Sequence, residues 1–204
     1  MLGKPHLKPY EGKFRAVVVF GPPGSGKGTL GAALACAAEM FHLSSGDIFR
    51  GLDPDSPGGK LFSQYAGKGR LVPDEATLEI WLHYVHGLIA TNRYHPTRQI
   101  LLVDGVPRTE KQVELFDAHL DIVRVLSLEG DEELFVSRLQ GRALKEGRAD
   151  DADIEVIRTR MGVYQEQTAK VLGHFPVEKI LRVDATQSKV AVLRDVLVGL
   201  TDQI

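Results

Sequence analysis

The sequence predicts an α/β fold in which a five-stranded parallel sheet carries helices on both faces. Short apolar, β-branched runs alternate along the chain with longer segments that have helical spacing. The first of these runs passes through a glycine-rich loop directly into an Ala- and Leu-rich segment. A length of 204 residues, 43% of them apolar, suits one sizeable core and therefore a single compact domain.

The first strand is expected at residues 14–20 (FRAVVVF), because an apolar β-branched run followed by Gly and Pro is typical of a buried parallel strand. A helix should follow at residues 27–40, which are rich in Ala and Leu. Ligands of such sheets bind at the carboxyl ends of the strands, so we expect functional residues there. The other four strands are expected at residues 41–44, 99–103, 122–128 and 179–183.

Gly and Pro mark two further segments. Residues 53–59 (DPDSPGG) are predicted to form a loop within an inserted lobe, because Pro and Gly interrupt them repeatedly. A helix is expected over about residues 153–172, and Gly173 together with Pro176 should end it.

The charge balance gives the protein no overall attraction to nucleic acid or membrane, since 25 Lys and Arg face 27 Asp and Glu. The single cysteine, Cys36, excludes a disulfide within the chain, suits the reducing cytoplasm and is expected in the core. No apolar run approaches the roughly 18 to 20 residues of a membrane span. Residues 1–13 lack the apolar core of a signal peptide, and we interpret them as a flexible lead-in.

The segment 21–29 (GPPGSGKGT) is predicted to bind the phosphates of a nucleoside triphosphate. Its glycines let successive backbone N–H groups face inward, Lys27 supplies a cation, and the next helix supplies its positive end. The alternative, a plain glycine-rich turn, does not account for the strand before it, the helix after it and the central lysine. Gly28 stands where the common P-loop has Ser or Thr for magnesium, and Thr29 comes one place later.

Asp104 ends an apolar run (LLVDG), where its carboxylate is expected to hold magnesium directly or through water. The alternative is a turn formed by Asp-Gly at the end of a strand. Beside a phosphate-binding loop we favour the metal role.

Six segments, GPPGSGKGT, HLSSGDIFR, GKGRLVPDE, DGVPRTEKQ, RLQGR and GRADD, occur in the order and approximate spacing of the nucleoside monophosphate kinases. Together they make the chain resemble the adenylate kinases, over nearly all of its length after residue 14. The resemblance implies a P-loop NTPase type of fold in one domain, 14–204. Its implied parts are a core (14–43, 74–140 and 152–204), a small helical NMP-binding lobe (44–73) and a short lid (141–151).

The resemblance also implies roles for particular residues. The ATP site would comprise Gly24, Ser25, Gly26, Lys27, Gly28, Thr29, Arg138, Arg142 and Gln187. The AMP site would comprise Ser45, Arg50, Arg70, Leu71, Val72, Gly105, Arg108, Gln112, Arg148 and Arg160. The catalytic set would be Lys27, Arg108, Arg142, Arg148, Arg160 and the acidic pair Asp150 and Asp151, which would orient the arginines.

Two positions bear on the acceptor base. Ser45 stands where adenylate kinases usually have Thr and pyrimidine relatives tend to have Ala. Gln112 matches the glutamine that reads the adenine edge, where pyrimidine kinases usually carry Asn. Both differences point to AMP.

The acceptor's chemistry explains the arginine-rich set. A nucleoside monophosphate has a second pKa of about 6, is already largely ionised and needs no general base, so catalysis would come from positioning and electrostatics. A lid would exclude water, with Gly141 and Gly147 as hinges. The lid has no Cys or His, so no structural zinc is expected there.

The leading interpretation is therefore a magnesium-dependent ATP:AMP phosphotransferase that forms two ADP. Its partners would be ATP, AMP and ADP, without nucleic acid or membrane, and the resemblance implies a monomer. Three alternatives stay open: a kinase for CMP, UMP or GMP, a P-loop kinase for a small alcohol, and a nucleotide sensor without turnover.

Overall fold

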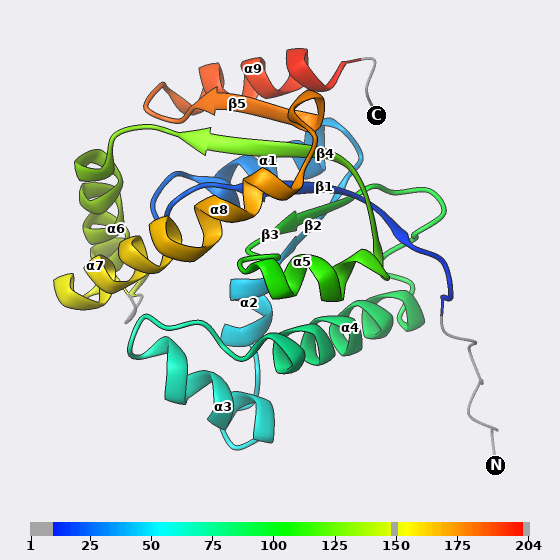
Figure 1. Cartoon of the computed structure of the whole chain (residues 1–204), viewed down its shortest axis with the longest axis horizontal. Coiled ribbons are helices and arrows are strands. Elements are labelled where there is room, and N and C mark those ends of the chain that lie inside the picture. Colours follow the sequence, from blue (N-terminus) through cyan, green and yellow to red (C-terminus); the bar gives the residue numbers. More distant parts are fainter. Residues whose placement is uncertain (1–9, 148–150, 202–204) are drawn as a thin grey trace.

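The protein folds around one parallel sheet of five strands, shown in Figure 1 as a computed structural model that describes residues 10–147 and 151–201. The strand order is β2-β3-β1-β4-β5, and every pairing is parallel. The predicted five-stranded α/β fold is thus confirmed. The strands are β1 (Phe14–Phe20), β2 (Phe41–Ser44), β3 (Leu101–Asp104), β4 (Leu120–Glu129) and β5 (Ile180–Asp184).

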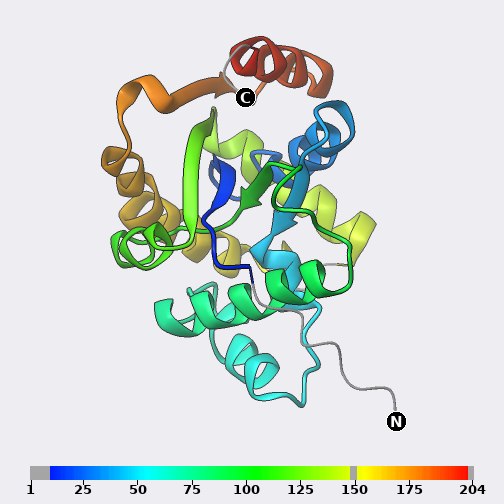
Figure 2. The same cartoon turned by 90° about the vertical axis from the view of Figure 1, so that its right-hand side faces the viewer.

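The central strand β1 is buried on both faces, because successive side chains point to opposite sides of the sheet. Ala16 and Val18 enter one apolar core, whereas Val17 and Val19 enter the other. The first core contains residues of α4 (Asp74–Ala90), α5 (Glu110–Asp117) and α8 (Ala169–Val171). The second contains residues of α1 (Lys27–Ala37), α6 (Glu132–Glu146), α7 (Ile154–Val163) and α9 (Lys189–Leu200). In Figure 2 the strands run between α1 on one side and α5 with α8 on the other.

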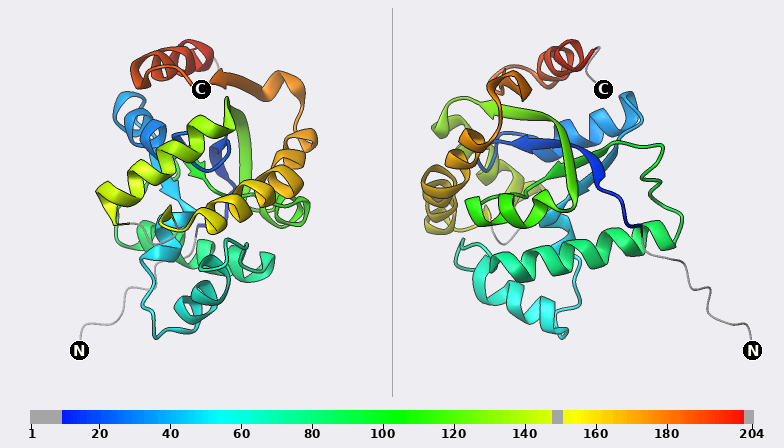
Figure 3. Two further views of the ribbon diagram at one scale, coloured as in Figure 1. Left: turned by 90° about the vertical axis from the view of Figure 1, so that its left-hand side faces the viewer. Right: turned by 45° about the vertical axis from the view of Figure 1, so that its right-hand side comes forward.

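Two helices lie on the side of the molecule away from α9, as both panels of Figure 3 show. They are α2 (Ser45–Arg50) and α3 (Pro57–Ala66), and the rings of Phe49 and Phe62 stack between them at 5.4 Å. The prediction of a loop over residues 53–59 was wrong for its last part, because α3 begins at Pro57. Proline fits a first helical position, and Ser56 caps the helix by accepting a hydrogen bond of 3.0 Å from Gly59 N–H.

The expected helix over about 153–172 is present, although it is not regular throughout. It consists of α7, a π-helical turn η2 (Tyr164–Thr168), α8 and a 3-10 turn η3 (Leu172–His174). A second 3-10 turn, η4 (Val177–Lys179), leads into β5. The π turn lies beside the site described below, since Tyr164 and Thr168 line its larger cavity.

The hinge expected at Gly141 stays a prediction; α6 continues through this residue to Glu146, and Gly147 ends the helix at a left-handed φ of 64°. The expectation that Cys36 lies in the core was wrong. Cys36 is exposed, because α1 turns Leu30, Gly31 and Leu34 towards the core instead. In the described residues no helix is both long and apolar enough to cross a membrane.

Candidate active site

The loop after β1 contains glycines whose positions do not tolerate a side chain. Gly24 has a φ of 82°, and a Cβ there would lie 2.3 Å from the carbonyl oxygen of Phe135 in α6. Gly26 has a φ of 97° and forms the N-cap of α1 without any side-chain hydrogen bond. The first N–H groups of α1 therefore have no side-chain acceptor at the cap, which makes this helix end suitable for an anion.

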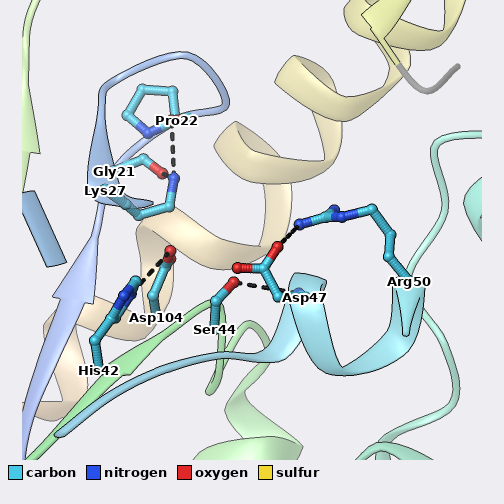
Figure 4. A network of polar contacts seen from close by, with 8 residues as sticks. All are labelled: Gly21, Pro22, Lys27, His42, Ser44, Asp47, Arg50 and Asp104. Atoms are coloured by element: carbon cyan, nitrogen blue, oxygen red, sulfur yellow. Dashed lines mark hydrogen bonds and ion pairs between the residues drawn. The ribbon is translucent and has the colours of Figure 1, made fainter. Parts of the chain in front are cut away.

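Lys27 folds back over this loop, as Figure 4 shows. Its Nζ donates hydrogen bonds to the carbonyl oxygens of Gly21, at 2.6 Å, and Pro22, at 3.0 Å. Burial lowers the pKa of Lys27 to about 8, although the carboxylate of Asp104 acts in the opposite direction. The arginines that lower it further are Arg108, Arg160 and Arg142.

Two cavities adjoin at the carboxyl ends of the strands. The larger, of about 440 Å³, is lined by most of the glycine loop, by Asp104 and by Tyr164 of the π turn. The smaller, of about 100 Å³, lies over α2 and α3 and includes Ser45 and Gln112. Three arginines line both cavities: Arg50, Arg108 and Arg160. Cationic groups are therefore concentrated at the boundary between the cavities, where two anionic ligands would meet.

Asp104 lies at the end of β3, with only 7% of its surface exposed. Its Oδ2 is 3.9 Å from Nε2 of His42, and Ser44 lies opposite it in the β2–β3 pairing. Asp47 lines the same cavity. The described residues include no group of three or more His, Cys, Asp or Glu that could hold a metal. One or two carboxylates beside a phosphate-binding loop fit magnesium, which is usually bound through substrate phosphates and water as well.

Arg108 is held by two hydrogen bonds, one to the backbone of Gly105 and one to the side chain of Gln112. Its Nε donates to the carbonyl oxygen of Gly105 at 2.5 Å, and its backbone N–H donates to Oε1 of Gln112 at 2.7 Å. Burial lowers the pKa of Arg108, Asp104 raises it, and Arg160 and Arg50 lower it further. The contact with Gly105 orients the guanidinium of Arg108, and within the described residues this group forms no hydrogen bond with a carboxylate. Such an arrangement is suited to an anionic ligand.

Asp151 joins two arginines of the larger cavity. Its side chain is fully buried and accepts from Nε of Arg142 and Nη1 of Arg160, each at 2.6 Å. Burial alone would raise the pKa of Asp151, but the hydrogen bonds and charges of the two arginines hold it below its ordinary value. The carboxylate therefore fixes both guanidinium groups.

The sequence profile described as adenylate kinase matches residues 19–180. The chain belongs to the adenylate kinase family. The adenylate kinase of Flavobacterium johnsoniae is 39% identical over 165 residues, which is 78% of this chain and 83% of that protein. The adenylate kinase of Kocuria rhizophila is also 39% identical, over 181 residues, 84% of this chain and 91% of that protein. That of Cyanothece is 36% identical over 178 residues, 84% of this chain and 87% of that protein.

Most residues that the adenylate kinase resemblance singled out line the two cavities. Those in the larger cavity are Gly24, Gly26, Lys27, Gly28, Thr29, Asp104 and Arg142. Those in the smaller one are Ser45, Arg70, Val72 and Gln112. Those in both are Arg50, Leu71, Gly105, Arg108 and Arg160. The structure thus brings together residues from the loop, α2, the segment before α4 and the end of β3.

Other expected adenylate kinase site residues lie elsewhere. Ser25 is 3% exposed and lines neither of these two cavities. Arg138 donates to the carbonyl oxygen of Ala185 at 2.8 Å, and Gln187 donates to Asp195 at 2.9 Å; neither Arg138 nor Gln187 lines either cavity. Arg148 and Asp150 lie outside the described residues.

Sequence reasoning missed two acidic residues. Asp47 forms an ion pair with Arg50 (Figure 4) and follows the cap residue Ser44, a pattern readable in HLSSGDIFR. Asp74 contacts Gln112, which is 38 positions away in sequence. No local pattern signals that contact, because it depends on how α4 and α5 pack.

Proposed function

We propose that this member of the adenylate kinase family transfers the γ-phosphate of ATP to AMP reversibly, with magnesium, to give two ADP. The observation that carries the proposal is the pair of adjoining cavities that share Arg50, Arg108 and Arg160. One cavity contains a phosphate-binding loop, and the other contains Gln112 and Ser45. The boundary between them is where the transferring phosphoryl group would lie.

Phosphoryl transfer needs charge stabilisation more than covalent chemistry from the protein. In the proposed reaction the loop N–H groups and Lys27 bind the ATP phosphates, while Arg50 and Arg108 bind the AMP phosphate. Arg142 and Arg160, fixed by Asp151, face the group in transit. A monophosphate, with its second pKa of about 6, is already an anion at neutral pH, so no side chain has to remove a proton.

Asp104, with Asp47 nearby in the same cavity, would hold magnesium through water. When bound, the ion would neutralise charge on the β- and γ-phosphates. The chain's own contribution is to keep Asp104 buried at the end of β3. The lack of structural zinc stays a prediction.

We also propose that residues 44–73 act as the AMP-binding lobe and residues 141–151 as a short lid over a core formed by the rest of 14–204. The position of α3 away from the sheet and the stack of Phe49 on Phe62 support a distinct lobe. The cytoplasm is the expected location, since the one cysteine suits a reducing compartment. A monomer is expected from the adenylate kinase family alone.

The deciding experiment incubates the protein with magnesium-ATP and with AMP, CMP, UMP or GMP separately, and separates the products by chromatography. ADP should be the only product formed from ATP and AMP, and AMP should react at the highest rate of the four monophosphates. Preference for another monophosphate would overturn the assignment of AMP. Turnover of a small alcohol such as shikimate but not of AMP, or unaltered ATP with every acceptor, would overturn the proposed reaction.

A further inference from the structure

Asp74, the first residue of α4, forms a polar contact that none of the roles above uses. Its Oδ1 accepts hydrogen bonds from Nε2 of Gln112 at 2.8 Å and from Oγ1 of Thr109 at 3.0 Å. Thr109 in turn caps α5 by accepting from the N–H of Gln112 at 3.0 Å. One carboxylate oxygen of α4 is thus tied to both the cap and the side chain at the start of α5.

These contacts determine which way the Gln112 amide points. The backbone N–H of Arg108 can only donate, so it requires Oε1 of Gln112, at 2.7 Å. The Asp74 carboxylate can only accept, so it requires Nε2. A rotation of the amide by 180° would place two donors together at Arg108 and two acceptors together at Asp74. Since Gln112 is 2% exposed, water does not compensate for either mismatch.

One N–H and one acceptor position of the Gln112 amide remain for a ligand in the smaller cavity. Adenine presents an acceptor at N1 beside an amino donor at position 6, whereas hypoxanthine and guanine present an N1–H donor beside an oxo acceptor at position 6. An amide that is locked in one orientation satisfies only one of these patterns. An amide that rotates freely satisfies both, because it exchanges its donor and its acceptor.

We propose that Asp74 is a positioning residue that makes the protein distinguish 6-amino from 6-oxo purine monophosphates by locking the Gln112 amide. Asp74 itself lines neither cavity and acts through Gln112. The inference rests on the proposed function, because it assigns the smaller cavity to the acceptor nucleotide. It deepens that assignment by naming what fixes the orientation of the reading group.

The test compares AMP with IMP, which differ only at this part of the base, in wild type, Asp74→Ala and Asp74→Asn. Loss of one charge-assisted hydrogen bond should lower the AMP-to-IMP ratio of kcat/KM by about 5- to 30-fold in Asp74→Ala. Asn keeps an acceptor oxygen, so Asp74→Asn should retain more of the ratio. Most of the change should appear in KM, with kcat at saturating AMP within about threefold of wild type.

Glu75→Ala is the matched control, because Glu75 is the exposed neighbour in the same first turn of α4. It should leave the ratio unchanged. Calorimetry measures the relative affinity for AMP and IMP at equilibrium and needs no turnover. A failure of the proposed reaction can therefore be distinguished from a failure of Asp74 to orient Gln112. An AMP-to-IMP ratio in Asp74→Ala equal to that of wild type, even with a lower melting temperature, would overturn the proposal.

Discussion

The Nζ of Lys27 donates a hydrogen bond of 2.6 Å to the carbonyl oxygen of Gly21, at the other end of the same loop. The ammonium group is therefore held by neutral oxygens of the backbone while burial works against its charge. Nucleotide phosphates would replace these neutral acceptors with charged ones. Binding should then restore the proton affinity of Lys27.

This relationship predicts that ATP binding depends on pH through Lys27, whose pKa is about 8. Bound phosphates raise the pKa of Lys27, so binding at a pH above about 8 is accompanied by uptake of a proton. The affinity for ATP should therefore fall by up to about tenfold for each pH unit above that value. Titration calorimetry in buffers of different ionisation enthalpy measures the proton uptake. Lys27→Arg stays charged, so its affinity should vary little between about pH 7 and 9.5. An equal pH dependence in both proteins would contradict the role of Lys27.

Removal of Arg108 should disable the acceptor side of the reaction. Arg108→Ala is expected to lower kcat/KM for AMP by about 10²- to 10³-fold, with a smaller effect on KM for ATP. Arg108→Lys should recover little, because a lysine cannot donate to Gly105 and to a phosphate through one rigid fork. Steady-state kinetics with each substrate varied in turn provide the measurement. Arg158→Ala, at an exposed position in α7, serves as the control, and a loss as large in that variant would remove the specific role of Arg108.

Replacement of Asp151 should affect both catalysis and stability. Asp151→Asn removes the charge that holds Arg142 and Arg160, so turnover should fall at least about 10-fold and unfolding free energy by about 2 to 4 kcal/mol. The folded-state pKa of Asp151 is depressed below 3.8. Its contribution is therefore fully present above that pH and is lost as the pH falls through the depressed pKa.

Urea unfolding at a series of pH values tests this sign. The stability difference between wild type and Asp151→Asn should be constant at neutral pH and narrow only below about pH 4. Asp121→Asn, at an exposed position in β4, should show little difference at any pH. A difference for Asp151→Asn that grows on acidification would contradict the interpretation.

The close approach of Gly31 to His42 leads to a further prediction about packing. A Cβ at Gly31 of α1 would lie 2.4 Å from Nε2 of His42, so Gly31→Ala must displace the imidazole from its place beside Asp104. The expected loss is about 1 to 3 kcal/mol. Gly87→Ala in α4 meets no atom within 4 Å and should gain about 0.5 to 1 kcal/mol instead. Chemical denaturation measures the change in unfolding free energy of each variant. A change of the same sign in Gly31→Ala and Gly87→Ala would contradict the prediction.

The sheet was predictable because its signal is local. FRAVVVF is apolar on both alternating faces, as a strand with a core on each side requires. The loop was predictable for a similar reason, since its glycines and lysine are adjacent in sequence. The start of α3 was missed because Pro57 was interpreted as a helix breaker, although proline at a first position favours a helix.

The remaining errors concern information that a local pattern does not carry. Cys36 lies in an Ala- and Leu-rich segment, but α1 turns other residues of that segment towards the core. The contact of Asp74 with Gln112 joins residues 38 positions apart and exists only because α4 packs on α5. The resemblance did imply that Asp151 orients arginines, and the structure adds that its two oxygens bind Arg142 and Arg160 separately.

The position of β1 in the middle of the sheet has a consequence for synthesis. β1 ends in the phosphate-binding loop, but both of its neighbours, Leu101–Asp104 and Leu120–Glu129, come much later in the chain. A nascent chain that has only just exposed GPPGSGKGT on the ribosome has no partner strands to hold that loop in shape. A chain truncated before β3 therefore contains the motif without the two strands that flank β1 in the folded protein.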